Sequence, residues 1–171
     1  MKRLTLSMLA LALIATATSA QAQERKGFWF TGGLGYGSLG CDNCGSRTGS
    51  WSGGLALGGT VSPHFQIGVG MAGWSKSELG GSLTVGTLDA RVKFYPSKGG
   101  FYLTGGAGAG SVSAGFGGLS GSETGVSMLL GLGYDIPMGK LAITPYWNGF
   151  AVRTSNTTPN VGQLGIAISV P

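Results

Sequence analysis

Three ionisable side chains occupy alternate positions of one strand-like segment, at Asp89, Arg91 and Lys93. Alternate side chains of a strand point to the same face, so these three share one side and the apolar Val92 lies on the other. Gln163 belongs to the polar face of another segment and is expected to line the same interior. Such a group can bind or select a small ligand. It can equally form an internal ion-pair network.

Two cysteines, Cys41 and Cys44, are separated by Asp42 and Asn43 in a loop-like segment. A redox pair of this spacing normally has its thiolate stabilised at a helix start, and nothing nearby predicts a helix. A metal site is disfavoured because only Asp42 offers a third ligand and no histidine is close. We expect a local structural disulfide, with no metal and no cofactor.

Two further patterns resemble functional motifs. The segment 35–40 matches GxGxxG, but it lies in a strand and does not open a helix, as phosphate binding requires. The only histidine, His64, follows Ser62 and Pro63 in a predicted turn. No carboxylate accompanies the Ser–His pair, so a catalytic triad cannot be assembled locally. The sequence therefore predicts no catalytic residues.

Composition excludes an ordinary soluble domain. Charged residues make up only 10% of the chain, while glycine reaches 35 of 171 residues; a soluble domain has about 25% charged residues. The net charge of +5 is too small and too scattered to suggest nucleic-acid binding. A basic start, an apolar stretch and the small residues Ala20 and Ala22 predict a signal peptide over 1–22. Residues 23–171 then form one domain.

This domain divides into eight strand-like runs, long enough to cross a bilayer at a tilt. The runs are 27–39, 51–61, 65–77, 82–95, 101–114, 124–136, 140–152 and 161–170. Tight turns with proline join some of them, at 62–64, 96–100 and 137–139. The other connections alternate with these; three are longer and polar, at 40–50, 115–123 and 154–160, and the fourth, 78–81, is short. Short turns on one rim and longer loops on the other are typical of outer-membrane barrels.

Side chains alternate with a period of two. In the third run Phe65, Ile67, Val69 and Met71 share one face, and small or polar residues share the other. A sandwich or lipocalin-like barrel would also alternate, with its apolar face inward. The second face here is mostly glycine, alanine, serine and threonine, a poor surface for water but suited to a crowded lumen. We therefore place the apolar face against lipid.

Aromatic residues gather near the run ends, where rings of an interfacial belt would lie. Those near the short turns are Phe28, Phe30, Phe65, Phe94, Tyr95, Phe101, Tyr102 and Tyr134. Those near the opposite rim are Tyr36, Trp51, Trp74 and Phe150. Pro145 lies inside a run, which predicts a β-bulge there. In the fourth run the apolar side chains change face between Val85 and Leu88, which predicts a bulge near Gly86 or the membrane boundary.

From residue 27 to residue 171 the chain resembles the small outer-membrane barrels of OmpA/OmpX type. The resemblance rests on the eight alternating runs, turns such as 96–100, and the signal peptide. It implies an eight-stranded antiparallel up-and-down transmembrane β-barrel that is monomeric and located in the outer membrane. The implied partners are outer-membrane lipids, lipopolysaccharide and the barrel-assembly machinery. The family's last strand commonly ends in an aromatic residue, whereas this one ends Ser169-Val170-Pro171.

We expect a non-enzymatic barrel with a structural or surface-interaction role. In this reading Asp89, Arg91 and Lys93 form an internal network, with Asp135 as a further partner, because eight strands leave room only for side chains or one small ligand. The alternative is a narrow pore or a small-ligand-binding lumen lined by these residues and Gln163. A third hypothesis, a lipid-modifying enzyme, is disfavoured because His64 falls on the short-turn rim.

Overall fold

The computed structural model describes residues 25–41, 45–78 and 80–170. The regular structure in these ranges consists of strands. They are β1 (Phe28–Gly40), β2 (Thr48–Ser62), β3 (Phe65–Glu78), β4 (Gly81–Phe94), β5 (Phe101–Phe116), β6 (Leu119–Tyr134), β7 (Ile136–Met138), β8 (Leu141–Arg153) and β9 (Asn160–Val170). The described residues contain no helix with the length and apolarity that a membrane crossing requires.

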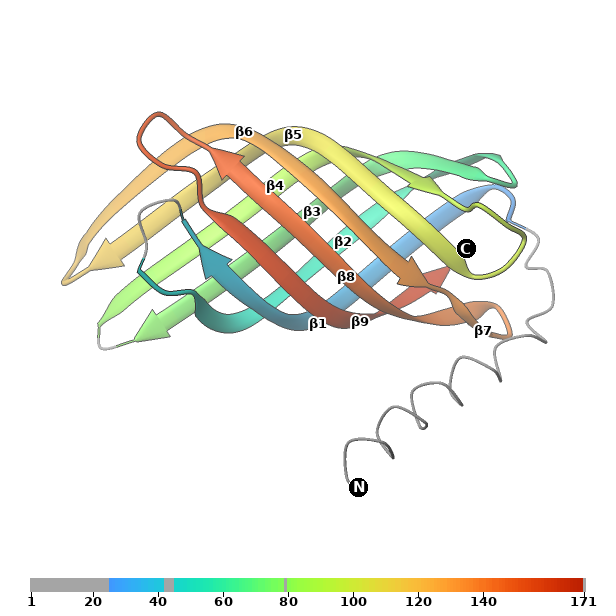
Figure 1. Ribbon diagram of the computed structural model, residues 1–171, viewed down its shortest axis with the longest axis horizontal. Helices are drawn as coiled ribbons and strands as arrows, with labels where there is room; N and C mark the ends of the chain where they lie inside the picture. Colours follow the sequence, from blue (N-terminus) through green and yellow to red (C-terminus); the bar gives the residue numbers. More distant parts are fainter. Residues whose placement is uncertain (1–24, 42–44, 79, 171) are drawn as a thin grey trace, which may run out of the picture.

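The strands close into a ring. Each long strand pairs antiparallel with the next one along the chain, β6 pairs with β8, and β9 returns to pair with β1. The three-residue β7 continues the line of β6 along β8. Figure 1 shows the strands running obliquely around one long axis. Every long strand therefore has two neighbours, which leaves no free sheet edge and confirms the predicted eight-stranded barrel.

One predicted loop is wrong. Residues 115–123 extend β5 and β6 into a long hairpin, and the two strands stay paired up to Phe116 and Leu119. Gly117 and Gly118 make the turn with φ angles of 59° and 87°, which glycine adopts without strain. A hydrogen bond between the side chains of Ser113 and Ser122 (3.1 Å) also joins the strands.

Neither predicted bulge is present. Gly86 pairs in continuous register with Gly73 on one side and Ser111 on the other. Pro145 pairs with Ile166, and on its other side the ladder stops and resumes in the same register. Proline has no N–H to donate, so the pairing is interrupted there without an inserted residue. The described strand pairs shift register only between Thr60 and Ser62, beside a tight turn.

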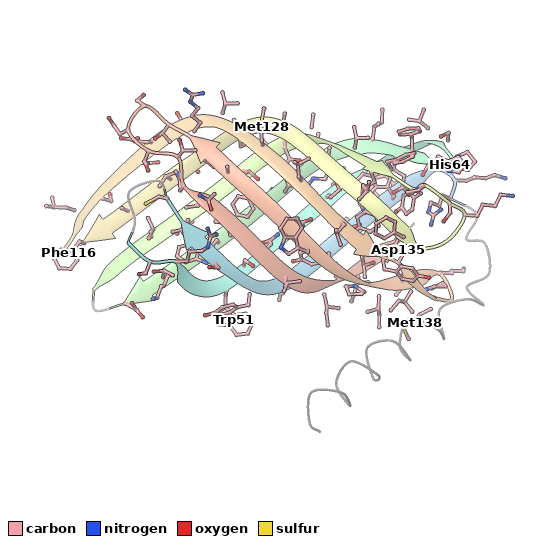
Figure 2. All side chains as sticks on the ribbon, viewed as in Figure 1. Trp51, His64, Phe116, Met128, Asp135 and Met138 are labelled. Atoms are coloured by element: carbon pink, nitrogen blue, oxygen red, sulfur yellow. The ribbon has the colours of Figure 1, made fainter. Side chains whose placement is uncertain are left out.

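Apolar side chains cover the outside of the ring. Leu130 and Ile166 are 70% and 63% exposed in the isolated chain, and Figure 2 shows Trp51 and Met128 projecting away from the wall. Such a surface requires lipid rather than water. The apolar side chains of β4 change from one face to the other because Val85, which is completely buried, points into the interior.

The interior is apolar in the half of the barrel near the longer hairpins. One cluster of buried side chains fills it: Leu39, Ala72, Trp74, Val85, Leu129, Phe150, Val152 and Val161. Trp74 donates its indole N–H to the Gly37 carbonyl (3.0 Å). A Cβ at Gly37 would lie 2.8 Å from Cδ1 of Trp74. Glycine thus makes room for the tryptophan ring.

The expected aromatic belts form only in part. Phe28, Phe65 and Phe101 are exposed near the short turns, and Tyr36 and Trp51 are exposed near the other rim. Four of the expected belt residues turn inward instead: Trp74, Tyr95, Tyr102 and Phe150. These rings fill the lumen, where a narrow barrel needs bulk.

Candidate functional site in the barrel lumen

Asp89 and Arg91 form a buried ion pair on the inner face of β4. Nε of Arg91 donates to Oδ1 of Asp89 and Nη2 donates to Oδ2, each at 2.8 Å. Two parallel bonds between a guanidinium and a carboxylate are among the strongest side-chain contacts. A Cβ at Gly70 would lie 2.5 Å from the Arg91 guanidinium carbon, and one at Gly106 would collide with Asp89. Glycines on the neighbouring strands therefore provide space for the pair.

Lys93 lies in the same polar layer without an ion pair. Its ammonium donates to the Thr31 hydroxyl (2.7 Å) and lies 4.5 Å and 4.8 Å from the ring centroids of Trp29 and Tyr102. Both rings are within reach of a cation–π contact. Among the described residues, no carboxylate oxygen lies within 4.0 Å of this ammonium. The expected network of ion pairs thus comprises one pair and a separate cation.

Asp135 connects to Lys93 through hydroxyl groups. Its carboxylate accepts bonds from the hydroxyls of Thr144 (2.7 Å) and Tyr95 (2.9 Å). Thr144 bonds to Ser169 (3.0 Å), whose hydroxyl also bonds to Thr31 (3.1 Å), the acceptor for Lys93. Asp135 is thus a member of the network, as expected, but through hydroxyls rather than as a direct partner of a cation.

Arg25 closes the mouth on the short-turn side. Its guanidinium donates to the Gly99 carbonyl (2.6 Å) and stacks over the Tyr95 ring, 3.6 Å from the centroid. Arg25 is buried although it precedes the first strand. The sequence contains no signal for this role, because no alternation extends to that position and the partner residues are about 70 positions away in the chain.

A small cavity of about 30 Å³ lies next to this network. Arg91, Lys93 and Gln163 line it, as do Tyr146 and Tyr102. The structure therefore brings three of the four residues of the predicted lumen cluster to one cavity, and Asp89 adjoins it through Arg91. Oε1 of Gln163 and the hydroxyl of Tyr146 are buried and have no hydrogen-bond partner in the described ranges.

The other candidate residues do not join the lumen. His64 is exposed in the turn between β2 and β3, where Nδ1 bonds to the Tyr95 carbonyl (2.7 Å). Cys41 is disulfide-bonded; its expected partner, Cys44, lies outside the described residues, so the pairing stays a prediction. In the described part of the chain, no group of three or more His, Cys, Asp or Glu side chains could hold a metal ion.

A closed ring of eight tilted strands with apolar side chains outside and ionic side chains inside defines a transmembrane β-barrel. The profile of the outer membrane protein beta-barrel domain matches residues 8–169, and the chain belongs to this family. Its location is accordingly the outer membrane. No curated protein sequence matches the chain at a significant level.

Three solved structures of bacterial proteins show the same fold. Neisserial surface protein A superposes with a TM-score of 0.64 at 11% identity, over 86% of this chain and 99% of its own. Ail, the attachment invasion locus protein of Yersinia pestis, gives 0.62 at 15% identity, over 84% and 99%. OprG from Pseudomonas aeruginosa gives 0.51 at 11% identity, over 88% and 99%. At these identities the similarity concerns the fold alone.

Proposed function

We propose that this protein is a non-enzymatic outer-membrane barrel whose lumen does not conduct, and that it has a structural or surface-interaction role. The observation that supports this is the filling of the lumen by two successive groups of buried side chains. The first is the polar network around Asp89, Arg91 and Lys93, and the second is the apolar cluster around Trp74. The small cavity beside the network has room for about two water molecules.

The surface role is assigned to the hairpins on the side opposite the short turns, which faces outward in barrels of this type. The β5–β6 hairpin ends in Phe116 and Leu119, which are 73% and 82% exposed. Figure 2 shows Phe116 at one extreme end of the molecule, with His64 and Met138 near the other. An apolar tip beyond the barrel wall supports contact with other molecules at the cell surface.

Reconstitution in planar bilayers tests whether the lumen conducts ions. The purified barrel should give no steady conductance above that of the protein-free bilayer. Stable channels whose ion selectivity changes on Arg91→Ala would contradict the proposal and favour the narrow pore. The alternative of a ligand-binding lumen is supported by the small cavity that Arg91, Lys93 and Gln163 line.

An enzymatic role has little geometric support. The Ser62 hydroxyl accepts the backbone N–H groups of His64 (3.3 Å) and Phe65 (3.2 Å) and thereby stabilises the turn. The His64 ring bonds to a backbone carbonyl instead. Activity on lipid A that was lost in His64→Ala would reverse this assignment.

We also propose how the protein is exported and assembled. A signal peptide over 1–22 is removed, and the barrel-assembly machinery inserts residues 23–171 as a monomer among outer-membrane lipids and lipopolysaccharide. Cell fractionation followed by N-terminal sequencing tests the cleavage site. Electrophoresis with and without boiling tests the folded barrel, because the compact form should migrate differently from the heated one.

A further inference from the structure

We propose that the lumen cavity binds one small monatomic anion of the chloride class, held by Lys93, Arg91 and Tyr146. This inference goes beyond the proposed function and does not depend on it, since an anion could be held in a sealed or in a conducting barrel. Three independent features of the cavity support it: its unpartnered polar groups, its charge and its size.

The polar groups around the cavity are incompletely bonded. The Tyr146 hydroxyl and Oε1 of Gln163 are both buried, and neither has a hydrogen-bond partner among the residues that the structure describes. Nearly all buried polar atoms in folded proteins have partners, so each exception needs an explanation, and one explanation is a bound ion. The O and N atoms of an amide are interchangeable by a flip, so Gln163 can turn its NH₂ group toward the cavity. Tyr146 can donate its O–H.

The charges around the cavity do not balance. Among the described residues, the lumen buries three cations, at Arg25, Arg91 and Lys93, against the two carboxylates of Asp89 and Asp135. Asp89 is bonded to Arg91, and Asp135 accepts hydroxyl groups.

Lys93 lines the cavity and forms no ion pair with the described residues. An ammonium has three N–H donors, and within the described part of the chain the only hydrogen-bond acceptor of Lys93 is the Thr31 hydroxyl. The Asp135 carboxylate attracts this ammonium but accepts hydrogen bonds from hydroxyl groups instead. A buried cation without a direct ion pair is costly in a region of low dielectric constant. An anion in the cavity would supply the missing charge and accept the spare donors.

The volume of the cavity limits which anion it can hold. The cavity measures about 30 Å³, and a single water molecule needs roughly 10–15 Å³ by this measure. A halide ion fits, whereas a phosphate, a carboxylate ligand or a sugar does not. Small residues open the space, among them Gly33, Gly54 and Ala167. The proposal is therefore a structural anion enclosed by the polar network.

Urea unfolding of the full mature barrel in detergent micelles tests this inference, because urea adds no anion of its own. Sodium chloride is compared with sodium gluconate at equal ionic strength, since gluconate is too large for the cavity. Chloride should raise the unfolding midpoint. A site half-saturated at about 10 mM would increase the folding equilibrium constant about tenfold at about 100 mM chloride.

Variants assign the effect to this cavity. Lys93→Gln should abolish the difference between chloride and gluconate, and Tyr146→Phe should reduce it while keeping the ring in place. Lys98→Gln, which changes an exposed cation in a short turn, should leave the difference unchanged. Equal midpoints in the two salts, or the same chloride effect in Lys93→Gln, would overturn the proposal.

Diffraction provides a test that does not require the variants to fold. Crystals of the unchanged protein grown in sodium bromide should show an anomalous peak between Lys93, Arg91 and Tyr146. A cavity that contains density without an anomalous signal would hold water, and the anion would be rejected. Conductance measured separately then decides the proposed function, so the two proposals can fail independently.

Discussion

At the scale of single residues, the glycines of this barrel act mainly through the space that they leave. Gly37 faces the lumen, and a Cβ there would lie 2.8 Å from the Trp74 ring. Gly59, on the neighbouring strand β2, has no atom within 4 Å of the position where a Cβ would be. The two positions therefore allow the same substitution to be compared in a filled and an open environment.

Gly37→Val should lower the free energy of unfolding by about 1–3 kcal/mol, the usual cost of overpacking a well-filled interior. Gly59→Val should change it by less than about 0.5 kcal/mol. Urea titration of both variants in the same detergent measures the difference. Equal losses would show that glycine is needed for backbone flexibility at both positions and that the contact with Trp74 is not decisive.

Removing one charge of the Asp89–Arg91 pair should lower stability more than removing both charges. Asp89→Ala leaves a guanidinium buried without its carboxylate and should cost about 3–5 kcal/mol of unfolding free energy. The double variant Asp89→Ala with Arg91→Met removes both charges and should be more stable than Asp89→Ala alone. A double variant less stable than either single variant would mean that the pair itself contributes large net stability.

The sequence predicted which of these residues face the lumen but not how they are paired. Alternation along β4 places Asp89, Arg91 and Lys93 on one face regardless of the other strands. The partners of Lys93 are Thr31, Trp29 and Tyr102, on strands that are distant in the chain. Local periodicity contains no information about such contacts, since they depend on the register of several strand pairs.

At the scale of the strands, whether a side chain points toward lipid or into the lumen decides whether the barrel can enter a membrane. Val92 is outward and partly exposed, whereas its neighbour Lys93 is buried in the lumen. Val92→Arg places a new charge in hydrocarbon and should cost about 2–4 kcal/mol near the middle of the bilayer. Lys93→Ala introduces no charge on the lipid side.

We expect Val92→Arg to reduce the fraction of protein that shows the folded mobility in unheated electrophoresis, and Lys93→Ala to reduce it much less. Val92→Leu serves as the control for a change of side chain at the same position. Equal folded fractions for Val92→Arg and Val92→Leu would contradict the assignment of this face to lipid.

Strands were predictable where side chains alternate and less so where glycine and serine dominate. The third predicted run, 65–77, differs from β3 by one residue, because large apolar side chains occupy every second position from Phe65 to Met71. The sequence predicts a loop over 115–123 because a Gly- and Ser-rich composition is the same in a turn and in a glycine-rich hairpin. Only the pairing of β5 with β6 distinguishes them.

At the scale of the whole molecule, the pairing around the ring and the filling of the lumen explain the two irregularities that the sequence showed. Pro145 tolerates its missing N–H because β8 keeps its pairing with β9 throughout. Val85 faces inward because the lumen changes from polar to apolar along the barrel axis. The sequence suggested a bulge at Pro145 because a closed barrel has no free edge for a missing N–H, and one near Gly86 because the apolar side chains change face there. A narrow barrel can instead be filled by either kind of side chain.

The polar network and the apolar cluster fill successive lengths of the lumen, so an ion would have to pass both of them. Trp74→Ala removes the largest side chain of the apolar cluster but leaves the Asp89–Arg91 pair and Lys93 in place. It should lower stability by about 3–5 kcal/mol and still give no steady conductance in planar bilayers. Arg91→Ala alone should likewise remain closed, because the apolar cluster is intact.

Conductance should appear only when both groups are disrupted together, in the double variant Trp74→Ala with Arg91→Ala. Unheated electrophoresis must first show that each variant retains the folded mobility, so that conductance is compared between folded barrels. Channels in Trp74→Ala alone would mean that the polar network leaves a continuous water path. In that case the apolar cluster would be the only barrier to ions, and the polar residues would line a pore that the cluster closes.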